Sequence, residues 1–211
     1  MFRKITRRSL EKFLAKHATE ERVLDIGSGG SSYHRFFPNR LAIDIDPARK
    51  PDIVGDAHAL PFKDGEFGAI VCTEVLEHLK DPRLAISEMS RVLKKGGTLI
   101  LTTRFVYPIH DSPHDYWRFT KYGLRELFQA WDVVELIEET QTFSTIGVLL
   151  QRIAFQTRLR LNMLAKFKLF ILAWIFDHLN WLIREEYGDI GKSSTEHVIM
   201  TSGYYIVCKK R

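Results

Sequence analysis

Short apolar runs alternate with segments of helical periodicity along much of the chain, and this alternation limits the folds that the chain can adopt. The runs that suit strands lie at residues 22–26, 41–44, 52–54, 68–72, 98–102, 131–137 and 203–208. Strands that alternate with helices form βαβ crossovers, which produce a mostly parallel sheet covered by helices on both faces. The sequence therefore predicts an α/β protein with a seven-stranded sheet in three layers.

Local signals place helices between these strands. Residues near 5–18 have the spacing of an amphipathic helix. Asp81-Pro82 begins a second helix, because aspartate accepts hydrogen bonds from the first backbone amides and proline fits the first helical position. We expect Gly96-Gly97 to end this helix, and a further helix to cover residues 120–128 with a threonine as its N-cap.

A long segment at about 143–200 separates the last two predicted strands. We expect it to be mostly helical, because one stripe at helical spacing is formed by Leu164, Phe167, Ile171, Trp174, Ile175, His178 and Leu182. A length of 211 residues suits one domain. We therefore predict a single domain over residues 1–211, in which the segment at 143–200 is a helical insertion or cap.

The composition excludes several classes of protein. With 45% apolar and 27% charged residues, the chain has the make-up of a globular protein with a core. The longest apolar run, Leu169–Phe176, is far shorter than the roughly 20 residues of a membrane span, and we expect no signal peptide. The 2 cysteines form no CxxC pair or disulfide framework, so we expect a cytoplasmic protein. No dense basic and aromatic patch is present, so we expect no nucleic-acid partner.

Residues suited to binding adenosine follow three of the predicted strands. Gly27-Ser28-Gly29-Gly30 follows the first, and glycines let a backbone turn sharply and approach a ligand. Asp44, about 20 residues beyond Asp25, ends the second strand, where a carboxylate can accept hydrogen bonds from a ribose diol. Asp56 follows the third strand and could accept from an adenine amine. Strand ends of an open parallel sheet meet at one edge, which favours an adenosine-containing cofactor over a simple capping or surface role for these carboxylates.

Two classes of cofactor fit this pattern, the nicotinamide dinucleotides and S-adenosylmethionine (SAM). The dinucleotide fingerprint G-x-G-x-x-G has a third glycine, which lets a helix N-terminus hold the pyrophosphate. Ser32 stands at that position here. SAM has no phosphate, so the serine favours SAM and leaves a nicotinamide-dependent oxidoreductase as the weaker alternative.

Five segments, in order, resemble the class I SAM-dependent methyltransferases of the small-molecule (type 11) group. They are residues 24–29 (LDIGSG), 42–47 (AIDIDP), 55–62 (GDAHALPF), 74–78 (EVLEH) and 91–97 (RVLKKGG). The resemblance implies transfer of a methyl group from SAM to a small-molecule acceptor. It also implies a Rossmann-like sheet of strand order 3-2-1-4-5-7-6, with strand 7 antiparallel. Ser31 in place of a loop glycine and Gly68 in place of an aspartate depart from the family pattern.

The resemblance further implies which residues contact the cofactor. The methionine part of SAM would be held by Asp25, Gly27, Ser28 and Gly29. The ribose would be bound by Asp44, next to Ile45, and the adenine by Asp56 and Ala57. Cys72 and Thr73, at the end of the fourth predicted strand, would flank the cofactor.

Three histidines are candidates for the chemistry. SAM carries an activated methyl group, so the protein must mainly align an acceptor, with a general base where the acceptor is a hydroxyl or a protonated amine. His78 belongs to the segment Glu74–His78, which resembles a pattern linked to a divalent metal in quinone-biosynthesis O-methyltransferases. The alternative that we favour has Leu76 packed inward while Glu77 and His78 cap a helix, and we expect no metal.

The other two candidate bases, His110 and His114, lie in the segment 107–120 that directly follows the fifth predicted strand. Imidazole titrates near neutral pH, and Tyr116, Trp117 and Arg118 could bind a ring or an anionic acceptor. The alternative is structural, with Trp117 and Phe119 anchoring the loop while Asp115 pairs with Arg118. The segment resembles a loop of methyltransferase-like proteins associated with cell-surface polysaccharide synthesis, which implies a sugar or glycolipid acceptor.

The insertion also leaves alternatives open. Basic residues stand among its apolar residues, at Arg152, Arg158, Arg160, Lys166 and Lys168. Basic, apolar helices can lie at a membrane interface, so residues 146–186 could contact the inner face of a membrane. A lid over the active site or a dimer face is the other explanation. A non-catalytic domain that keeps the fold in order to bind a membrane or a partner protein is the rival to an enzyme.

Overall fold

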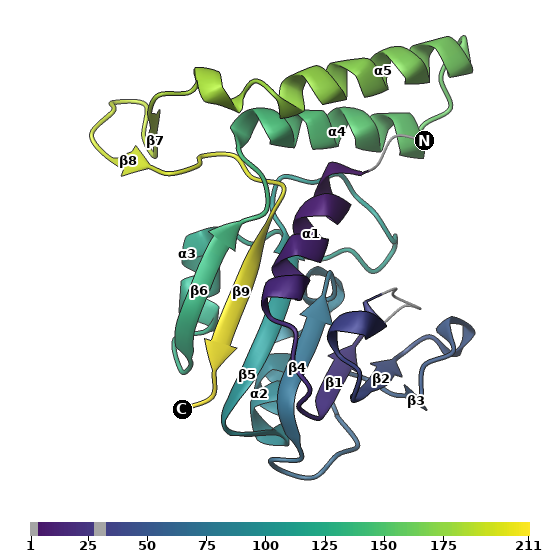
Figure 1. The fold of residues 1–211 in the computed structure, drawn as a ribbon, viewed down its shortest axis with the longest axis vertical. Helices are drawn as coiled ribbons and strands as arrows, with labels where there is room; N and C mark the ends of the chain where they lie inside the picture. Colours follow the sequence, from purple (N-terminus) through teal and green to yellow (C-terminus); the bar gives the residue numbers. More distant parts are fainter. Residues whose placement is uncertain (1–3, 28–32) are drawn as a thin grey trace. The chain divides into compact units, whose positions relative to one another are not determined.

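The computed structural model describes residues 4–27 and 33–211 (Figure 1). The chain divides into two compact units. The sheet unit comprises residues 13–104, 109–137 and 204–211, and the helical unit comprises residues 1–12, 105–108 and 138–203. Helix α1 (Ile5–Lys16) begins in the helical unit and ends in the sheet unit.

A seven-stranded sheet forms the centre of the sheet unit. Its strands are β1 (Val23–Ile26), β2 (Arg40–Asp44), β3 (Ile53–Val54), β4 (Phe67–Thr73), β5 (Leu93–Arg104), β6 (Asp132–Glu138) and β9 (Gly203–Lys209), in the spatial order β3-β2-β1-β4-β5-β9-β6. The first five strands pair in parallel. Strand β9 runs antiparallel to β5. Gly96 N, near the start of β5, donates to the carbonyl of Lys210, just after the end of β9. The predicted fold class and strand order are confirmed, and β9 is the seventh strand of the prediction.

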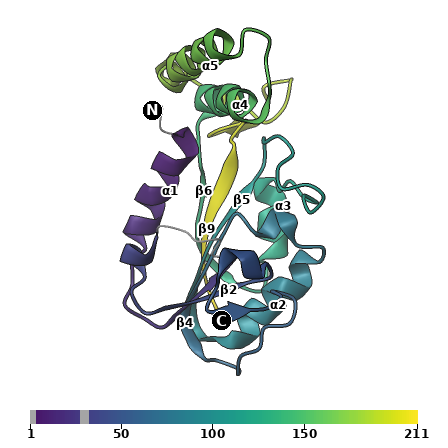
Figure 2. The same cartoon turned by 90° about the vertical axis from the view of Figure 1, so that its right-hand side faces the viewer.

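Helices cover both faces of this sheet (Figure 2). Helices α2 (Pro82–Val92) and α3 (Lys121–Leu127) lie on one face. The end of α1 lies on the other, where the Phe13 ring stacks on Tyr205 of β9 at 4.6 Å between centroids. The predicted caps are confirmed, since the Asp81 carboxylate accepts from two amides of α2 and the Thr120 hydroxyl accepts from Gly123 N at 3.1 Å.

The expectation that Gly96-Gly97 ends the second helix is wrong. Helix α2 ends at Val92, and β5 begins at the next residue. Leu93 is fully buried and pairs with Phe67 of β4. Strand pairing in the core therefore begins before the two glycines, which lie within β5 where its register against β4 shifts.

The helical unit is built on two helices, α4 (Thr142–Gln156) and α5 (Asn162–Asp177), which lie side by side (Figures 1 and 2). Their backbones approach closely at Gly147, where a Cβ would lie 2.7 Å from the carbonyl oxygen of Ala173. The predicted insertion is helical up to a short 3-10 helix, η4 (Asn180–Leu182). Beyond it, β7 (Glu186–Tyr187) and β8 (Thr195–Glu196) form an antiparallel pair. Across the described ranges, every helix is too short or too polar to cross a membrane.

Candidate functional site

The carboxyl ends of four neighbouring strands lie level along one edge of the sheet. Ile26 at the end of β1 pairs with Ile43 of β2 and with Cys72 of β4. Asp44 at the end of β2 pairs with Val54 of β3. The residues that end or follow these strands are therefore brought together at this edge, and they are Gly27, Asp44, Gly55 and Thr73.

Gly27 forms the turn out of β1. It has a positive φ of 67° and donates its N–H to the carbonyl of Ile43 at 2.8 Å. A Cβ at this position would lie 2.2 Å from Cγ2 of Val75. Both the backbone conformation and the lack of space require glycine here. The other loop residues predicted to hold SAM, Ser28 and Gly29, lie outside the described residues.

Asp44 is held at the sheet edge by a tight turn. Its side chain is buried, and Oδ1 accepts from the amide of Asp46 at 3.0 Å. Ile45 follows with 69% of its surface exposed. A buried carboxylate beside an exposed apolar side chain can bind a ribose diol while the apolar group covers a ring.

Asp56 is bonded to its neighbour His58 and stands next to the buried Ala57. Its Oδ1 accepts from the His58 amide at 2.9 Å and from His58 Nδ1 at 2.6 Å, while His58 Nε2 accepts from the amide of Asp81. Burial raises the pKa of Asp56, but the His58 hydrogen bonds outweigh it and leave the pKa below the usual value. Asp56 is therefore an ionised acceptor at neutral pH, as binding of an adenine amine requires.

Asp25 and Cys72 lie inside the sheet rather than open at its edge. The Asp25 carboxylate accepts from Arg40 Nη1 at 2.5 Å, and only 6% of the residue is exposed. Burial raises the pKa of Asp25 to about 6 against the opposing effect of Arg40. Cys72 is fully buried, and burial also raises the pKa of its thiol. Thr73, one residue further along β4, is half-buried at the edge.

A second cluster, formed by Glu77, His78 and His110, lies beyond the ends of β4 and β5. Glu77 and His78 belong to the 3-10 helix η3 (Leu76–His78). The His78 and His110 rings meet edge to face at 4.7 Å between centroids, and His110 Nε2 lies 3.9 Å from Glu77 Oε1. Glu77 is fully buried, and its Oε1 accepts no hydrogen bond from a described residue. Burial raises the pKa of Glu77, against the effect of Arg104.

The Nδ1 atom of each imidazole in this cluster faces an oxygen atom of the loop after β5. His78 Nδ1 donates to the carbonyl of His114 at 2.7 Å, which makes Nε2 the acceptor of the neutral ring. His110 Nδ1 lies 3.4 Å from Asp115 Oδ2, and the same oxygen accepts the His110 amide at 2.9 Å. Burial lowers the pKa of His110 to about 4, and His78 adds to this shift. His110 is therefore neutral at pH 7 and can accept a proton.

The expectation that Glu77 and His78 cap a helix is wrong, although Leu76 packs inward as expected. No side chain caps η3, and Asp81 is the cap of α2. The Glu77 carboxylate instead accepts from the Thr103 hydroxyl at 2.8 Å inside the protein. Because Glu77 enters the core, it cannot serve an exposed helix end.

A metal ion could be held by this cluster, because one ligand atom from each of Glu77, His78 and His110 lies within 4.8 Å of the others. One carboxylate and two imidazoles suit a divalent transition metal. Glu74, which the sequence pattern would include, is engaged elsewhere. It has a positive φ of 59°, and its carboxylate binds the Thr102 hydroxyl and Arg104.

The loop after β5 makes the anchoring contacts of the structural alternative drawn from the sequence. Asp115 pairs with Arg118 through two bonds of 2.6 and 2.7 Å, and the Trp117 indole donates to the carbonyl of Leu79 at 2.8 Å. These contacts anchor the loop, as the structural alternative expected. His114 is exposed and has its ring beside the Tyr116 hydroxyl, outside the cluster that contains His110.

Arg104 is a site residue that the sequence patterns did not identify. It ends β5 with only 6% of its surface exposed, binds Glu74, and opposes the rise in the Glu77 pKa. One sequence signal could have identified Arg104, because it is a charged residue at the end of an apolar strand, at the edge where ligands bind.

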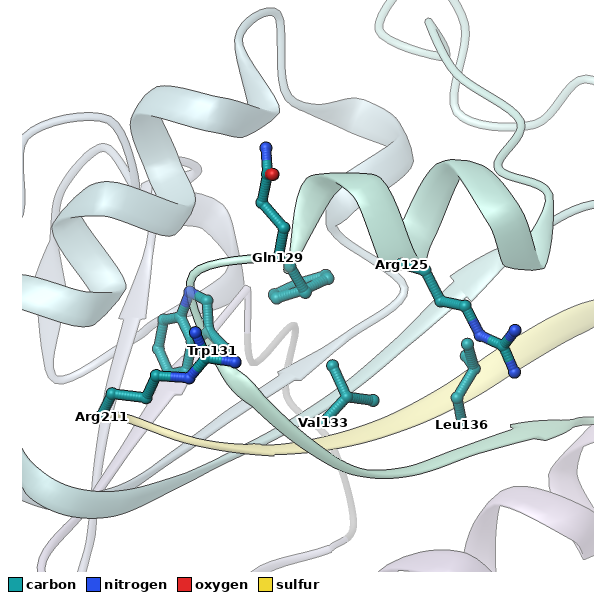
Figure 3. Close-up of a pocket in the computed structure, with 7 residues that line it drawn as sticks. Arg125, Gln129, Trp131, Val133, Leu136 and Arg211 are labelled. Atoms are coloured by element: carbon teal, nitrogen blue, oxygen red, sulfur yellow. The ribbon is translucent and has the colours of Figure 1, made fainter.

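A cavity in the sheet unit lies away from this edge (Figure 3). It has a volume of about 430 Å³ and is lined by residues of α3, the α3–β6 turn, β6 and the last residue of the chain, Arg211. None of the predicted cofactor or catalytic residues lines it. It is therefore not the candidate site.

Comparisons with known proteins find a family match over the strands whose ends form this edge of the sheet. Residues 24–101 match the family model described as a methyltransferase domain. A demethylmenaquinone methyltransferase of Renibacterium salmoninarum is 36% identical over 121 residues, which cover 51% of this chain and 50% of the relative. The chain thus spans about half of that relative's length.

Solved structures share the fold at low sequence identity. A geranyl diphosphate C-methyltransferase from Streptomyces coelicolor A3(2), in complex with Mg²⁺, geranyl diphosphate and S-adenosyl-L-homocysteine, superposes with a TM-score of 0.60 at 15% identity, covering 97% of this chain and 79% of that one. The [4+2]-cyclase SpnF superposes with a TM-score of 0.63 at 16% identity, covering 95% and 79%. The fold alone therefore does not fix the reaction. The family match runs from β1 into β5 and takes in the loops between these strands, so the edge described above lies within the part of the chain that is similar to a methyltransferase domain.

Proposed function

We propose that this protein transfers the methyl group of SAM to a small-molecule acceptor, within one domain that includes the insertion at 143–200. The single observation that carries the proposal is the level edge formed by Gly27, Asp44 and the Asp56 turn, next to the Glu77–His78–His110 cluster. A cofactor edge beside a proton-accepting group is what methyl transfer to a hydroxyl or amine needs.

The residues at the edge fit SAM chemically. Gly27, with a positive φ and no room for a Cβ beside Val75, gives the sharp turn that leads from β1 into the loop proposed to hold SAM. Asp44 and Asp56 supply two carboxylates for the ribose and the adenine amine, with Ile45 and Ala57 as apolar neighbours. Asp25, with the loop of Ser28 and Gly29, would hold the methionine part of SAM. Cys72 and Thr73, at the end of β4, would flank the cofactor. When bound, SAM supplies an activated methyl group, and the chain supplies position and shelter from water.

The proton of the acceptor would pass to His110. Its ring is neutral at pH 7, and Asp115, 3.4 Å from Nδ1, counters the effect of burial on the His110 pKa, because a carboxylate stabilises the imidazolium that forms. Asp115 behind Nδ1 orients the ring. His78 would assist as the second imidazole of the cluster. His114 would contact the acceptor from the exposed side of the loop.

Two acceptor classes are proposed. The relative named as a demethylmenaquinone methyltransferase favours a quinone-like ring, for which Tyr116 and Trp117 offer partly exposed aromatic faces. The resemblance of the segment 107–120 to a loop of methyltransferase-like proteins associated with cell-surface polysaccharide synthesis favours a sugar or glycolipid instead. The buried thiols of Cys72 and Cys208 are compatible with a cytoplasmic site of action.

Calorimetric titration with SAM, S-adenosylhomocysteine and NADH tests the cofactor. We expect both adenosyl ligands to bind and NADH to give no heat; binding of NADH alone would replace the proposal by an oxidoreductase. Incubation with SAM labelled at the methyl group and fractionated extract then tests the acceptor. Label is expected in a quinone, lipid or sugar fraction, and SAM binding without transfer to any fraction would favour a non-catalytic domain.

A further inference from the structure

Helix α5 presents an apolar face that the described residues of the helical unit leave largely exposed. Of its residues only Ala173 is buried, where the helix packs on α4. Another side of the helix, about 100° round from Ala173, carries a stripe at helical spacing with exposed fractions of 87% for Met163, 53% for Phe167 and 59% for Trp174. Exposed apolar neighbours widen this stripe, at Leu161, Leu164, Ile171, Leu172, Ile175, Trp181 and Leu182. We call this set the α5 face. Contiguous apolar surfaces of this kind mark contacts with a protein or a membrane.

The charges within residues 157–176, which hold most of the α5 face, have a single sign, while Asp177 at the end of α5 is bonded to Arg8. Residues 157–176 contain Arg158, Arg160, Lys166 and Lys168 and no acidic residue. The two arginines stand in the exposed loop that joins α4 to α5, alternating with leucines. Cations flanking an exposed apolar helix attract anionic lipid headgroups while the apolar side chains enter the acyl boundary.

The geometry points to the surface of an anionic bilayer as the occupant of the α5 face. The helix has 16 residues and would be about 24 Å long, so it would lie in the plane of the interface rather than span it. Trp174 and Trp181, both more than half exposed, are the residue type that favours the headgroup level.

A second copy of the chain fits this face less well. In a symmetric dimer the same patch meets itself, so the four cations of one copy would face those of the other. The segment 157–176 contains no carboxylate to pair with them. The charge pattern thus favours a partner that is itself anionic, and this inference does not depend on the proposed methyl transfer.

Vesicle co-sedimentation of the full chain tests the inference. We expect the protein to pellet with vesicles of phosphatidylcholine mixed with phosphatidylglycerol, to stay in solution with phosphatidylcholine alone, and to be released by salt. Each cation near an anionic surface favours partitioning by about fivefold. The quadruple variant R158Q/R160Q/K166Q/K168Q should therefore lower the partition coefficient by at least about tenfold. The matched control K63Q/R83Q/K94Q/K95Q removes four exposed cations from the sheet unit and should pellet like the parent protein.

The pair F167Q/W174Q removes apolar surface without changing charge and should also release the protein. Far-UV circular dichroism and thermal unfolding establish that each variant is folded. The inference is overturned if the parent protein does not pellet with anionic vesicles, or if the quadruple variant and its control pellet equally. It is also overturned if sedimentation velocity shows a dimer that F167Q/W174Q dissociates while vesicles bind neither form, because a second copy then covers the face.

Discussion

Arg40 Nη1 lies 2.5 Å from Asp25 Oδ2, and this ion pair joins β2 to β1 inside the sheet unit. Burial raises the pKa of Asp25 to about 6, although the guanidinium acts in the opposite direction. An acid that titrates near neutrality therefore stands in the first strand, two residues before the turn at Gly27.

The first prediction concerns the pH dependence of folding. The pKa of Asp25 is about 6 in the folded protein and about 4 in an unfolded chain, so the folded state binds the proton more tightly between these values. The contribution of Asp25 to the free energy of unfolding should thus fall as pH rises from about 4 to about 6. Urea unfolding across this range should show a weaker slope for Asp25→Asn, with the exposed Asp64→Asn as control. An identical slope in both variants would contradict the prediction.

The second prediction concerns Asp44, the carboxylate proposed to bind the ribose. Asp44→Asn should weaken SAM binding by at least about tenfold, because hydrogen bonds to a charged group contribute roughly 1.5–3 kcal/mol. Asp46→Asn changes an exposed carboxylate two residues away, whose oxygen accepts from the amide of Ala48, and should leave the affinity near that of the parent protein. Calorimetric titration measures both. Equal losses in the two variants would show that the turn, rather than Asp44, was disturbed.

The third prediction concerns the turn after β1. Gly27→Ala should destabilise the fold by about 2–4 kcal/mol, because its Cβ meets Val75 and a positive φ strains an L-residue. Val75→Ala in the same chain should recover only part of this loss, since it removes the collision and leaves the backbone strain. Chemical denaturation of the single and double variants measures the difference. A Gly27→Ala protein as stable as the parent would refute the crowding at this turn.

The fourth prediction separates the histidines. His110→Gln should lower kcat for methyl transfer by about a hundredfold or more while leaving the Kd for SAM unchanged, because a general base acts on the acceptor and not on the cofactor. His114→Gln should have a much smaller effect, since its ring lies outside the cluster. Steady-state kinetics and calorimetry on both variants provide the check. A larger loss in His114→Gln would reverse the assignment of the base.

The sheet could be predicted from the sequence because each buried strand is a short apolar run and parallel order follows from the crossovers. Asp44 and Asp56 could be placed for the same reason, since carboxyl ends of parallel strands share one edge. The start of β5 could not be predicted in this way. Leu93 joins the sheet because it pairs with Phe67, a residue distant in the sequence. The β7–β8 pair was missed because Glu186-Tyr187 and Thr195-Glu196 do not form the apolar run that marks the equally short β3.

The cluster of Glu77, His78 and His110 shows which part of the candidate site could not be predicted from the sequence. The sequence pattern groups Glu74 with Glu77 and His78 because they are adjacent in the chain. In the fold, Arg104 and Thr102 bind the Glu74 carboxylate, and the loop after β5 returns to bring His110 to the cluster. The path of that loop depends on its hydrogen bonds to η3, which leave no local trace in the sequence.

Those same hydrogen bonds limit how the protein can diversify. The carbonyl of Glu77 accepts from the amides of both Tyr116 and Trp117, Leu79 accepts from the Trp117 indole, and His78 donates to the carbonyl of His114. The loop proposed to contact the acceptor is thus hydrogen-bonded to the segment that holds two of the three cluster residues. Substitutions in the two segments should show strong epistasis, and transplanting residues 109–118 into another scaffold should succeed only when residues 76–79 are transplanted with them.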